Sequence, residues 1–484
     1  MHNRNRTRAK KAWVETYGCQ MNVSDGELMQ GVLAAGGYEP ASSAEDADVI
    51  LVNTCAIREH AEQRVLGRVS QLNKLKQERP DIVIGVTGCM AQRLGETLLE
   101  RAPYIDLVMG PDGYRGLNEV LAGLRPTAAA GCAGAARRSL PVLSGGGATS
   151  RAGADASLTA DGRAAVLAFD ASENYEGLEL HRSAGVSAWI PVQRGCDHRC
   201  TYCIVPYVRG PEKNRAPERV LDEVRRLAEQ GTVEVTLLGQ TVNSYRYDDW
   251  DFARLLRQVA RVDGIRRVRF TSPHPNDVTP ALVEVMATES AVCKQLHLPV
   301  QAGHDRTLKR MLRRYTVASF LETIELVRDA VPGIALSTDV IVAFPGESDA
   351  EYEATLELMR RVRFDDAYLY KYSPRAGTPA TRLPASEFIA AGVAQARLER
   401  LIELHRGIQA EINRAEVGRV VEVLVEREAK SAGDVLGRTE ANKVVAFAGG
   451  ADLIGRFLAV RLTATSGATF TGEAATLEPD QSAA

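Results

Sequence analysis

The sequence has no apolar run that approaches the roughly 18 residues of a membrane-spanning helix. It also has no excess of charge of one sign, since the net charge is −3, so a protein-wide basic field for nucleic acid is excluded. The N-terminal segment MHNRNRTRAKK is basic but lacks the apolar stretch and the cleavage site of a signal peptide. We therefore expect a cytoplasmic protein, in which cysteines are more often metal ligands than disulfide partners.

The composition is that of an ordinary globular protein. The chain has 484 residues, of which 45% are hydrophobic and 25% are charged. A chain of this length is expected to form two to four domains.

Six of the eight cysteines form two sets of three. The first set is spread along the N-terminal quarter, and the second lies within one segment, CDHRCTYC: these are Cys19, Cys55 and Cys89, and Cys196, Cys200 and Cys203. Three thiolates can hold a [4Fe–4S] cluster and leave its fourth iron free to bind a substrate. Two such sets predict two clusters, each able to do chemistry.

Residues 12–125 alternate short apolar segments with amphipathic helical patterns. The apolar segments AWVETYGC, DVILVNTC, DIVIGVTGC and IDLVMGP end in turn residues, which is typical of an open parallel α/β sheet covered by helices. Cys19, Cys55 and Cys89 follow three of these segments. Because ligands bind at the carboxyl edge of such sheets, we expect the three cysteines to converge there. The alternative is that they are three buried thiols acting as small hydrophobic residues.

Residues 126–185 are rich in Ala, Gly and Ser and offer little to bury. We interpret this stretch as a flexible linker or a surface insertion. Cys132 lies inside it and is given no ligand role, and Cys293, which has no partner pattern, is expected to be a core thiol.

Residues 186–415 repeat the strand–helix alternation about six times, from SAWIPVQRG to DDAYLYKYS. Six parallel units fit an incomplete (βα)6 barrel better than a closed eight-fold barrel. Residues 416–475 change to period-two patterning with Gly-rich turns, which predicts a small antiparallel β-barrel. The last ten residues are expected to be a disordered tail.

The spacing Cys-x3-Cys-x2-Cys directly after the first barrel strand is a specific signal. The alternative is a zinc site completed by His198 or by a distant ligand, although structural zinc sites usually show the fourth ligand at regular spacing. The segment resembles the radical S-adenosylmethionine (SAM) enzymes. This resemblance implies a [4Fe–4S] cluster on Cys196, Cys200 and Cys203, whose open iron is chelated by SAM, and a Tyr202 that lies near the adenine. It also implies reductive cleavage of SAM to a 5′-deoxyadenosyl radical, which a barrel interior protects from water.

Further barrel positions match that superfamily at strand ends. The resemblance implies that SAM is contacted by Gly239, Gln240, Ser337, Asp339 and Glu347. An ordinary turn is an equal alternative for the Leu238–Gln240 residues taken singly. Relatives more often have glycine where Ala343 stands. His297 and Gln301 are candidates to face the cavity, and a satisfied interior histidine is the alternative for His297.

The whole chain, apart from the linker and the tails, resembles the methylthiotransferases. The motifs YGCQMN, VNTCAIRE and TGCMAQR match the first domain of that family, and the C-terminal module resembles its RNA-binding TRAM domain. The segments NTCAIREHAEQR, LHLPVQAG and GRTEANKVV resemble the branch that converts isopentenyladenosine beside the anticodon of tRNA to 2-methylthio-isopentenyladenosine. The resemblance implies a sulfur-bearing auxiliary cluster on Cys19, Cys55 and Cys89. Two SAM molecules per turnover, a low-potential electron donor and a sulfur donor follow from the same chemistry.

RNA contacts have weaker support from the sequence. Arg438, Lys443 and Arg456 in the β module, together with Arg313 and Arg314 and the basic N-terminal tail, are candidates for phosphate contacts. Solvated charge is the alternative for each of them.

Other functions remain open at this point. One is the same chemistry on threonylcarbamoyladenosine in tRNA or on an aspartate of a ribosomal protein, which the sequence Ala-Ile-Arg-Glu after Cys55 disfavours. Another, of a different class, is a non-catalytic iron–sulfur RNA-binding protein or electron carrier.

Overall fold

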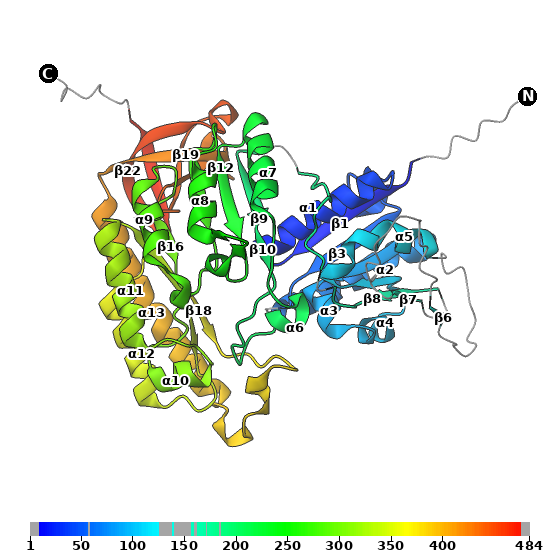
Figure 1. Cartoon of the computed structure of the whole chain (residues 1–484), viewed down its shortest axis with the longest axis horizontal. Coiled ribbons are helices and arrows are strands. Elements are labelled where there is room, and N and C mark those ends of the chain that lie inside the picture. Colours follow the sequence, from blue (N-terminus) through cyan, green and yellow to red (C-terminus); the bar gives the residue numbers. More distant parts are fainter. Residues whose placement is uncertain are drawn as a thin grey trace, which may run out of the picture. The chain divides into compact units, whose positions relative to one another are not determined.

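The computed structural model describes residues 9–56, 59–124, 138–139, 156–158, 162–170, 172–182 and 185–475. The chain divides into two compact units (Figure 1). The first comprises Met1–Ser183 with Arg194–His198 and Ile204–Lys213, and the second comprises Ala184–Gln193, Arg199–Cys203 and Asn214–Ala484. Cys132 and most of the basic N-terminal tail lie outside the described residues. Within the described part, no helix is both long and apolar enough to cross a membrane.

The first unit is built on an eight-stranded sheet with the strand order β2-β1-β3-β4-β5-β8-β7-β6. The strands are β1 (Lys11–Tyr17), β2 (Glu39–Pro40), β3 (Val49–Thr54), β4 (Val83–Gly88), β5 (Leu107–Met109), β6 (Arg138–Ser139), β7 (Ala156–Leu158) and β8 (Ala164–Val166). The helices are α1 (Gln20–Ala35), α2 (Glu59–Glu78), α3 (Cys89–Leu94), α4 (Thr97–Arg101), α5 (Leu117–Gly123) and α6 (Val205–Arg209). Strands β2, β1, β3, β4, β5 and β8 are parallel. Of these, β1, β3, β4 and β5 correspond to the four apolar segments predicted within residues 12–125.

Helices cover both faces of this sheet, because its central strands are apolar on both sides. In β3, Val49 and Leu51 belong to the core under α1 and α5. The alternating residues Ile50 and Val52 belong to the core under α2, α3 and α4. Two-sided burial is the expected state of a parallel strand, and it leaves only the strand ends for polar chemistry.

The interpretation of residues 126–185 as a linker is wrong at its C-terminal end. Ala164–Val166 forms the buried strand β8, which pairs in parallel with β5. Tyr175, Leu178 and Leu180 pack against the core under α1 and α5. Three small apolar residues give too short a pattern to stand out beside an Ala/Gly/Ser-rich stretch. From residues 126–161 the structure describes only β6 and β7.

The second unit contains six parallel strands in two three-stranded sheets, ordered β15-β12-β9 and β16-β17-β18. The strands are β9 (Ser187–Pro191), β12 (Glu234–Leu238), β15 (Arg267–Phe270), β16 (Gln295–His297), β17 (Ala335–Val342) and β18 (Asp366–Lys371). A parallel bridge between Val268 and Val292 links the two sheets. Among the described residues no ladder joins β18 to β9, so the incomplete barrel predicted from the sequence is confirmed.

Helices pack on the outer face of these strands and bury one large apolar core. They are α7 (Pro217–Glu229), α8 (Phe252–Ala260), α9 (Pro280–Thr288), α10 (Asp305–Arg310), α11 (Val317–Ala330), α12 (Asp349–Val362) and α13 (Ala391–Glu416). Short strands flank two of the loops: β10 (Gln193–Arg194), β11 (Lys213–Asn214), β13 (Arg246–Tyr247) and β14 (Trp250–Asp251). Cys293 is buried in this unit, as expected for a core thiol.

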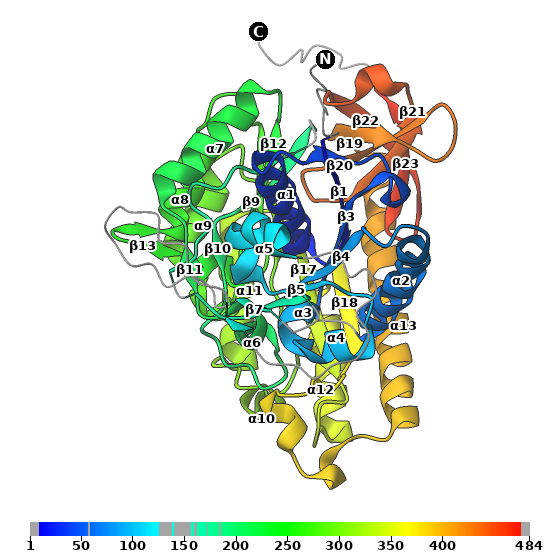
Figure 2. The same ribbon diagram turned by 90° about the vertical axis from the view of Figure 1, so that its right-hand side faces the viewer.

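The C-terminal module is a closed five-stranded barrel with the order β19-β20-β21-β23-β22. Its strands are β19 (Val420–Glu428), β20 (Asp434–Thr439), β21 (Val444–Ala448), β22 (Phe457–Ser466) and β23 (Thr469–Ala474). The predicted barrel is confirmed, except that β21 and β23 pair in parallel rather than antiparallel. The long helix α13 leads directly into the module in both views (Figures 1 and 2).

The module docks on the half barrel through buried arginines of β15. The Arg267 guanidinium donates to the Arg438 carbonyl oxygen at 2.7 Å. The Arg269 guanidinium donates to the carbonyl oxygens of Thr439 and Glu440, each at 2.8 Å. The turn at 438–443 therefore packs against the amino ends of the barrel strands, opposite to the edge where ligands bind in α/β folds.

Candidate functional site

The three N-terminal cysteines lie at the ends of adjacent parallel strands. Cys19 precedes the first residue of α1 shortly after β1, Cys55 directly follows β3, and Cys89 is the first residue of α3 directly after β4. Because β1, β3 and β4 are neighbours in the sheet, all three residues share its carboxyl edge, as predicted. A hydrogen bond from Cys55 lowers the pKa of Cys19 to about 6, which favours its thiolate form.

Two glycines allow this close packing. Gly18 has φ of 151°, and a Cβ there would lie 2.7 Å from the Cβ of Cys55. Gly88 has φ of 89°, and a Cβ there would lie 2.6 Å from the carbonyl oxygen of Thr54. Any other side chain would separate the strand ends that carry the cysteines.

Two buried asparagines hold the start of α1 against the end of β3. The Asn22 side chain donates to Asn53 Oδ1 at 3.3 Å and to the Thr54 carbonyl oxygen at 3.2 Å. Asn53 Nδ2 returns a bond of 2.7 Å to the Asn22 carbonyl oxygen, and Cys19 Sγ lies 3.2 Å from Asn22 Oδ1. The motif YGCQMN thus contains a ligand candidate and the residue that orients it.

A buried arginine completes the surroundings of Cys89. Arg209 Nε donates to Cys89 Sγ at 3.2 Å, and Arg209 Nη2 forms an ion pair of 2.6 Å with Asp25 Oδ2. Burial opposes the guanidinium charge, but Asp25 and Cys89 together raise the pKa of Arg209. Burial also raises the pKa of Cys89 to about 11, against the effect of Arg209. The sequence analysis did not identify Arg209 or Asp25.

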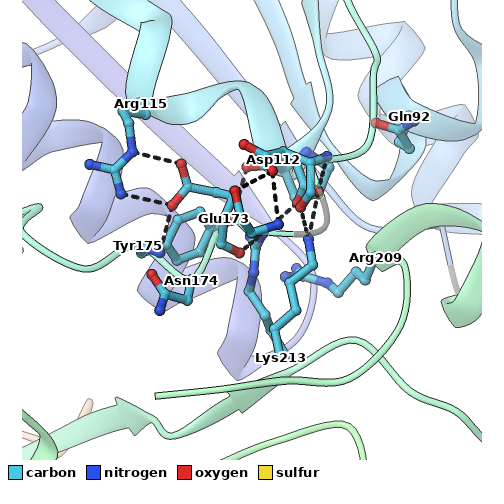
Figure 3. A network of polar contacts seen from close by, with 12 residues as sticks. Gln92, Asp112, Arg115, Glu173, Asn174, Tyr175, Arg209 and Lys213 are labelled. Atoms are coloured by element: carbon cyan, nitrogen blue, oxygen red, sulfur yellow. Dashed lines mark hydrogen bonds and ion pairs between the residues drawn. The ribbon is translucent and has the colours of Figure 1, made fainter. Parts of the chain in front are cut away.

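Residues on either side of the second cysteine set are fixed to the first unit by one carboxylate (Figure 3). Asp112 lies 2.5 Å from Arg194 Nη2 and 2.8 Å from Lys213 Nζ, and all three side chains are buried. The Arg194 guanidinium also stacks on the Tyr175 ring at 4.0 Å, and Glu173 binds Arg115 beside it. These contacts anchor Arg194–His198, which carries Cys196, and Ile204–Lys213, which carries Arg209.

Cys196 follows Gly195, a position that no residue with a side chain could occupy. Gly195 has φ of 78°, and a Cβ there would lie 1.8 Å from the Pro211 carbonyl oxygen. The Cys196 amide donates to the Gly210 carbonyl oxygen at 3.1 Å, which holds the two arms of the loop together.

Cys200 and Cys203 belong to the second unit, where a tight turn joins them through a hydrogen bond of 3.0 Å from the Cys203 amide to the Cys200 carbonyl oxygen. Thr201, between them, donates through its hydroxyl to the Arg310 carbonyl oxygen at 2.9 Å. Tyr202 is half-buried against the core of the half barrel. The C-terminal end of α10 thus holds this part of the cysteine segment.

Arg313 was a candidate for a phosphate contact, and the structure corrects this. Its guanidinium is buried, with Nη1 3.5 Å from Cys200 Sγ and Nε 2.9 Å from the Tyr315 hydroxyl. A side chain so enclosed cannot reach RNA. Instead, each cysteine set has a buried arginine beside one of its sulfurs, Arg209 in one case and Arg313 in the other.

The predicted SAM contacts divide into two groups. Gln240 follows Gly239 after β12, and its Oε1 is buried with no hydrogen-bond partner among the described residues. Ser337 and Asp339 share the inner face of β17, where Ser337 Oγ lies 3.0 Å and Asp339 Oδ2 lies 3.5 Å from the His297 ring nitrogens. These residues offer polar groups to a ligand, and their contact with SAM stays a prediction.

Glu347 is held by its own turn and by α13. Its buried carboxylate accepts hydrogen bonds of 2.7 Å from the Ala343 amide and from Arg397 Nη1. The side chain therefore fixes the turn 343–347, and its contact with SAM stays a prediction. Ala343 has φ of 57°, a left-handed conformation that costs a non-glycine residue roughly 1 kcal/mol, which explains why glycine would suit the position.

The three RNA candidates of the module also have different surroundings. Lys443 Nζ forms ion pairs with Asp365 at 3.0 Å and with Glu416. Arg438 Nε lies 3.3 Å from Glu426 Oε1, and Arg456 is exposed. Arg456 is thus placed as a phosphate contact requires, whereas the partners of Lys443 make it a docking residue. RNA binding by Arg438 and Arg456 stays a prediction.

Two exposed aromatic rings were missed. Tyr368 and Tyr370 lie two residues apart on one face of β18, and the Tyr368 ring meets the His297 ring edge-on at 5.7 Å. The alternation in DDAYLYKYS was the available signal, because tyrosines at every second position of a barrel strand face one side.

A half barrel of six parallel strands, with Cys-x3-Cys-x2-Cys after the first, defines a radical SAM enzyme. Residues 190–359 match the Radical SAM superfamily, residues 11–110 the uncharacterized protein family UPF0004, and residues 414–475 the TRAM domain. A tRNA-2-methylthio-N(6)-dimethylallyladenosine synthase of Moorella thermoacetica is 42% identical over 467 residues, which cover 94% of this chain and 96% of the relative. The synthase of Chlorobium limicola is 41% identical over 469 residues, with coverages of 96% and 98%. The chain therefore belongs to the tRNA-2-methylthio-N(6)-dimethylallyladenosine synthase family.

Solved structures agree on the fold. The radical SAM methyltransferase TsrM of Kitasatospora setae, whose structure holds cobalamin and a [4Fe–4S] cluster, has a TM-score of 0.55 at 13% identity, covering 77% of this chain and 74% of that one. The cobalamin-dependent SAM radical enzyme OxsB has a TM-score of 0.52 at 13% identity, covering 82% and 56%. At these identities the likeness concerns the fold alone.

Proposed function

We propose that this protein adds a methylthio group to carbon 2 of N6-isopentenyl (dimethylallyl) adenosine beside the anticodon of tRNA. The observation that carries the proposal is the match to synthases of that name over 94% of the chain at 42% identity. The family matches at residues 11–110, 190–359 and 414–475 include both cysteine sets and the β-barrel module.

The residues of both cysteine sets fit [4Fe–4S] clusters. The lowered pKa of Cys19 favours the thiolate, the form in which cysteine binds iron. Arg209 and Arg313 place a positive charge beside the Cys89 and Cys200 sulfurs, which balances the charge of a thiolate-ligated cluster. Ala56, Ile204 and Val208 pack with Cys89 in an apolar cluster that limits access of water.

When bound, the barrel cluster and SAM supply one-electron chemistry at the sulfonium, and the N-terminal cluster supplies sulfur that a second SAM methylates. The chain's own residues bind and orient. Gln240, Ser337 and Asp339 face the interior with polar groups suited to the methionine end of SAM. Tyr368 and Tyr370 offer rings on which an adenine with an apolar N6 substituent can pack.

The RNA partner is supported by the TRAM domain match and by the exposed Arg456. The isopentenyl group should fill an apolar part of the pocket and exclude water from the reacting carbon. A tRNA that carries isopentenyladenosine should therefore react, and an unmodified tRNA should react poorly. An electron donor and a sulfur donor are required by the chemistry.

The test is a mass-spectrometric comparison of tRNA nucleosides. Cells that lack this protein should accumulate isopentenyladenosine and lose its 2-methylthio derivative, and a plasmid copy should restore the derivative. An unchanged nucleoside profile would refute the proposal. Loss of 2-methylthio-threonylcarbamoyladenosine instead, or of methylthiolation on a ribosomal protein, would assign the same chemistry to another substrate. Failure of the reconstituted protein to cleave SAM would favour a non-catalytic iron–sulfur protein.

A further inference from the structure

Arg209 is the last residue of α6, six residues beyond Cys203, yet its side chain reaches the other cysteine set. The guanidinium belongs to the first unit and is only 4% exposed. We propose that Arg209 is a positioning residue of the N-terminal cysteine site, which holds a hydrogen bond and a positive charge on the Cys89 sulfur and so sets the reduction potential of a cluster bound there. The inference rests on the proposed function, because it assumes that this site holds a cluster.

The geometry favours arginine over any other cation. One edge of the guanidinium carries two donors, and here Nε–H points to Cys89 Sγ at 3.2 Å while Nη2–H points to Asp25 Oδ2 at 2.6 Å. Asp25 is buried on α1 and fixes the plane of the guanidinium. A lysine could supply the charge but not two directed donors from one rigid plane.

The third nitrogen of the Arg209 guanidinium also indicates that a ligand binds here. Arg209 Nη1 is buried, and it has no hydrogen-bond partner among the residues that the structure describes. A buried donor without a partner is unfavourable, so native structures rarely keep one. A cluster bound by Cys19, Cys55 and Cys89 would add sulfur acceptors to these surroundings.

The expected effect is a change in the reduction potential of the N-terminal cluster. Hydrogen bonds to cluster sulfurs and nearby positive charge stabilise the reduced, more negative state and raise the reduction potential. In water-excluded surroundings this influence is large, because the local dielectric constant is low. Removing the guanidinium should therefore make the N-terminal cluster harder to reduce, without removing any of its three ligands.

The experiment isolates this cluster. In a chain with Cys196, Cys200 and Cys203 replaced by alanine, anaerobic reconstitution loads only the N-terminal site. Arg209→Gln and Arg209→Lys are made in that background, iron and sulfide are counted, and the midpoint is measured by equilibrium titration with dithionite under electron paramagnetic resonance. We expect the midpoint to shift negative in Arg209→Gln and to shift less in Arg209→Lys, which keeps the charge.

A matched control and a rescue variant keep the test decisive. Lys76→Gln removes a largely buried ion pair with Asp106 at the amino edge of the same sheet, away from the cysteines, and should leave the midpoint unchanged. Arg209→Gln could fail to fold because Asp25 is left unpaired. In that case the double variant Asp25→Asn/Arg209→Gln, which removes both charges, takes the place of Arg209→Gln in the comparison with Arg209→Lys. A midpoint equal to that of the parent in every iron-loaded Arg209 variant would overturn the inference.

Activity then separates this inference from the proposed function. The midpoint is measured in the chain that lacks the barrel cysteines, and methylthio product is measured in the otherwise native chain. A midpoint shift in the Arg209 variants, together with no methylthio product from the native parent, would overturn the function and leave the role of Arg209 standing. Methylthio product from the parent with no midpoint shift in the variants would overturn the role of Arg209 alone.

Discussion

Replacing Lys443 with alanine should weaken the docking of the β-barrel module without changing the salt dependence of tRNA binding. Lys443 Nζ lies 3.0 Å from Asp365 Oδ1 and also contacts Glu416. The lysine side chain is 9% exposed, and each carboxylate is 20% exposed. An ammonium held by two carboxylates has little charge left for a phosphate, so few counterions should be released through it.

The magnitude follows from the burial of the pair. Removing one partner of a fully buried ion pair costs roughly 3–5 kcal/mol, whereas an exposed pair contributes about 0–1 kcal/mol. The exposures of Lys443 and its two carboxylates lie between these limits, so solvent screening reduces the cost to about 2 kcal/mol. A loss of that size changes the unfolding equilibrium of the second unit about 30-fold.

The assay pairs Lys443→Ala with Arg456→Ala in the full-length protein. Arg456 is exposed, so its replacement should lower the log–log salt slope of tRNA binding by about one unit and leave the urea midpoint unchanged. Lys443→Ala should do the reverse: an unchanged slope with a lower urea midpoint. A slope reduced by one unit in Lys443→Ala, with an unaltered midpoint, would refute the reasoning and return Lys443 to the RNA interface.

Three further predictions concern the cysteine sites. Anaerobically reconstituted protein should hold about eight iron atoms, and replacing Cys196, Cys200 and Cys203 with alanine should leave about half; tightly bound zinc without iron would contradict two clusters. The Cys55→Ala variant should still form 5′-deoxyadenosine but no methylthio product in a single-turnover assay, and product at the parental rate would make the N-terminal cysteines core thiols. Asp112→Asn should destabilise the metal-free protein by about 3 kcal/mol, because the buried cations that it pairs with lose their counterion; a urea midpoint like that of the parent would show that water screens this network.

The sequence was sufficient wherever a local pattern determines the structure. Cys19, Cys55 and Cys89 each follow a short apolar segment, and parallel strands bring their carboxyl ends to one edge whatever lies between them. The six barrel strands and four of the five strands of the module were likewise predictable from hydrophobic period and turn residues, whereas β20 (Asp434–Thr439) was missed. The strand Ala164–Val166 was missed because three small residues carry no period.

Buried charge was the part that the sequence could not predict. In the sequence, Arg209, Arg313 and Lys443 resemble any other basic residue. The reasonable expectation was that each is either exposed to solvent or bound to RNA. Their burial depends on carboxylates and sulfurs far away in sequence, such as Asp25 for Arg209 and Asp365 for Lys443. Only the tertiary structure brings such partners together, so the docking and positioning roles required it.

The two cysteine sets are separable by ligand substitution but not by removal of a domain. The sequence predicted residues 186–415 as one barrel domain that carries its own cluster ligands. In the structure, Arg194 and Lys213 flank that cysteine segment and both bind Asp112, which precedes α5 in the N-terminal α/β fold. A chain that begins at residue 184 would keep Cys196, Cys200 and Cys203 but lose the carboxylate that fixes both ends of their loop. We expect it to take up less than half the iron of the full chain on reconstitution, and uptake of half would show that the loop is ordered by the barrel alone.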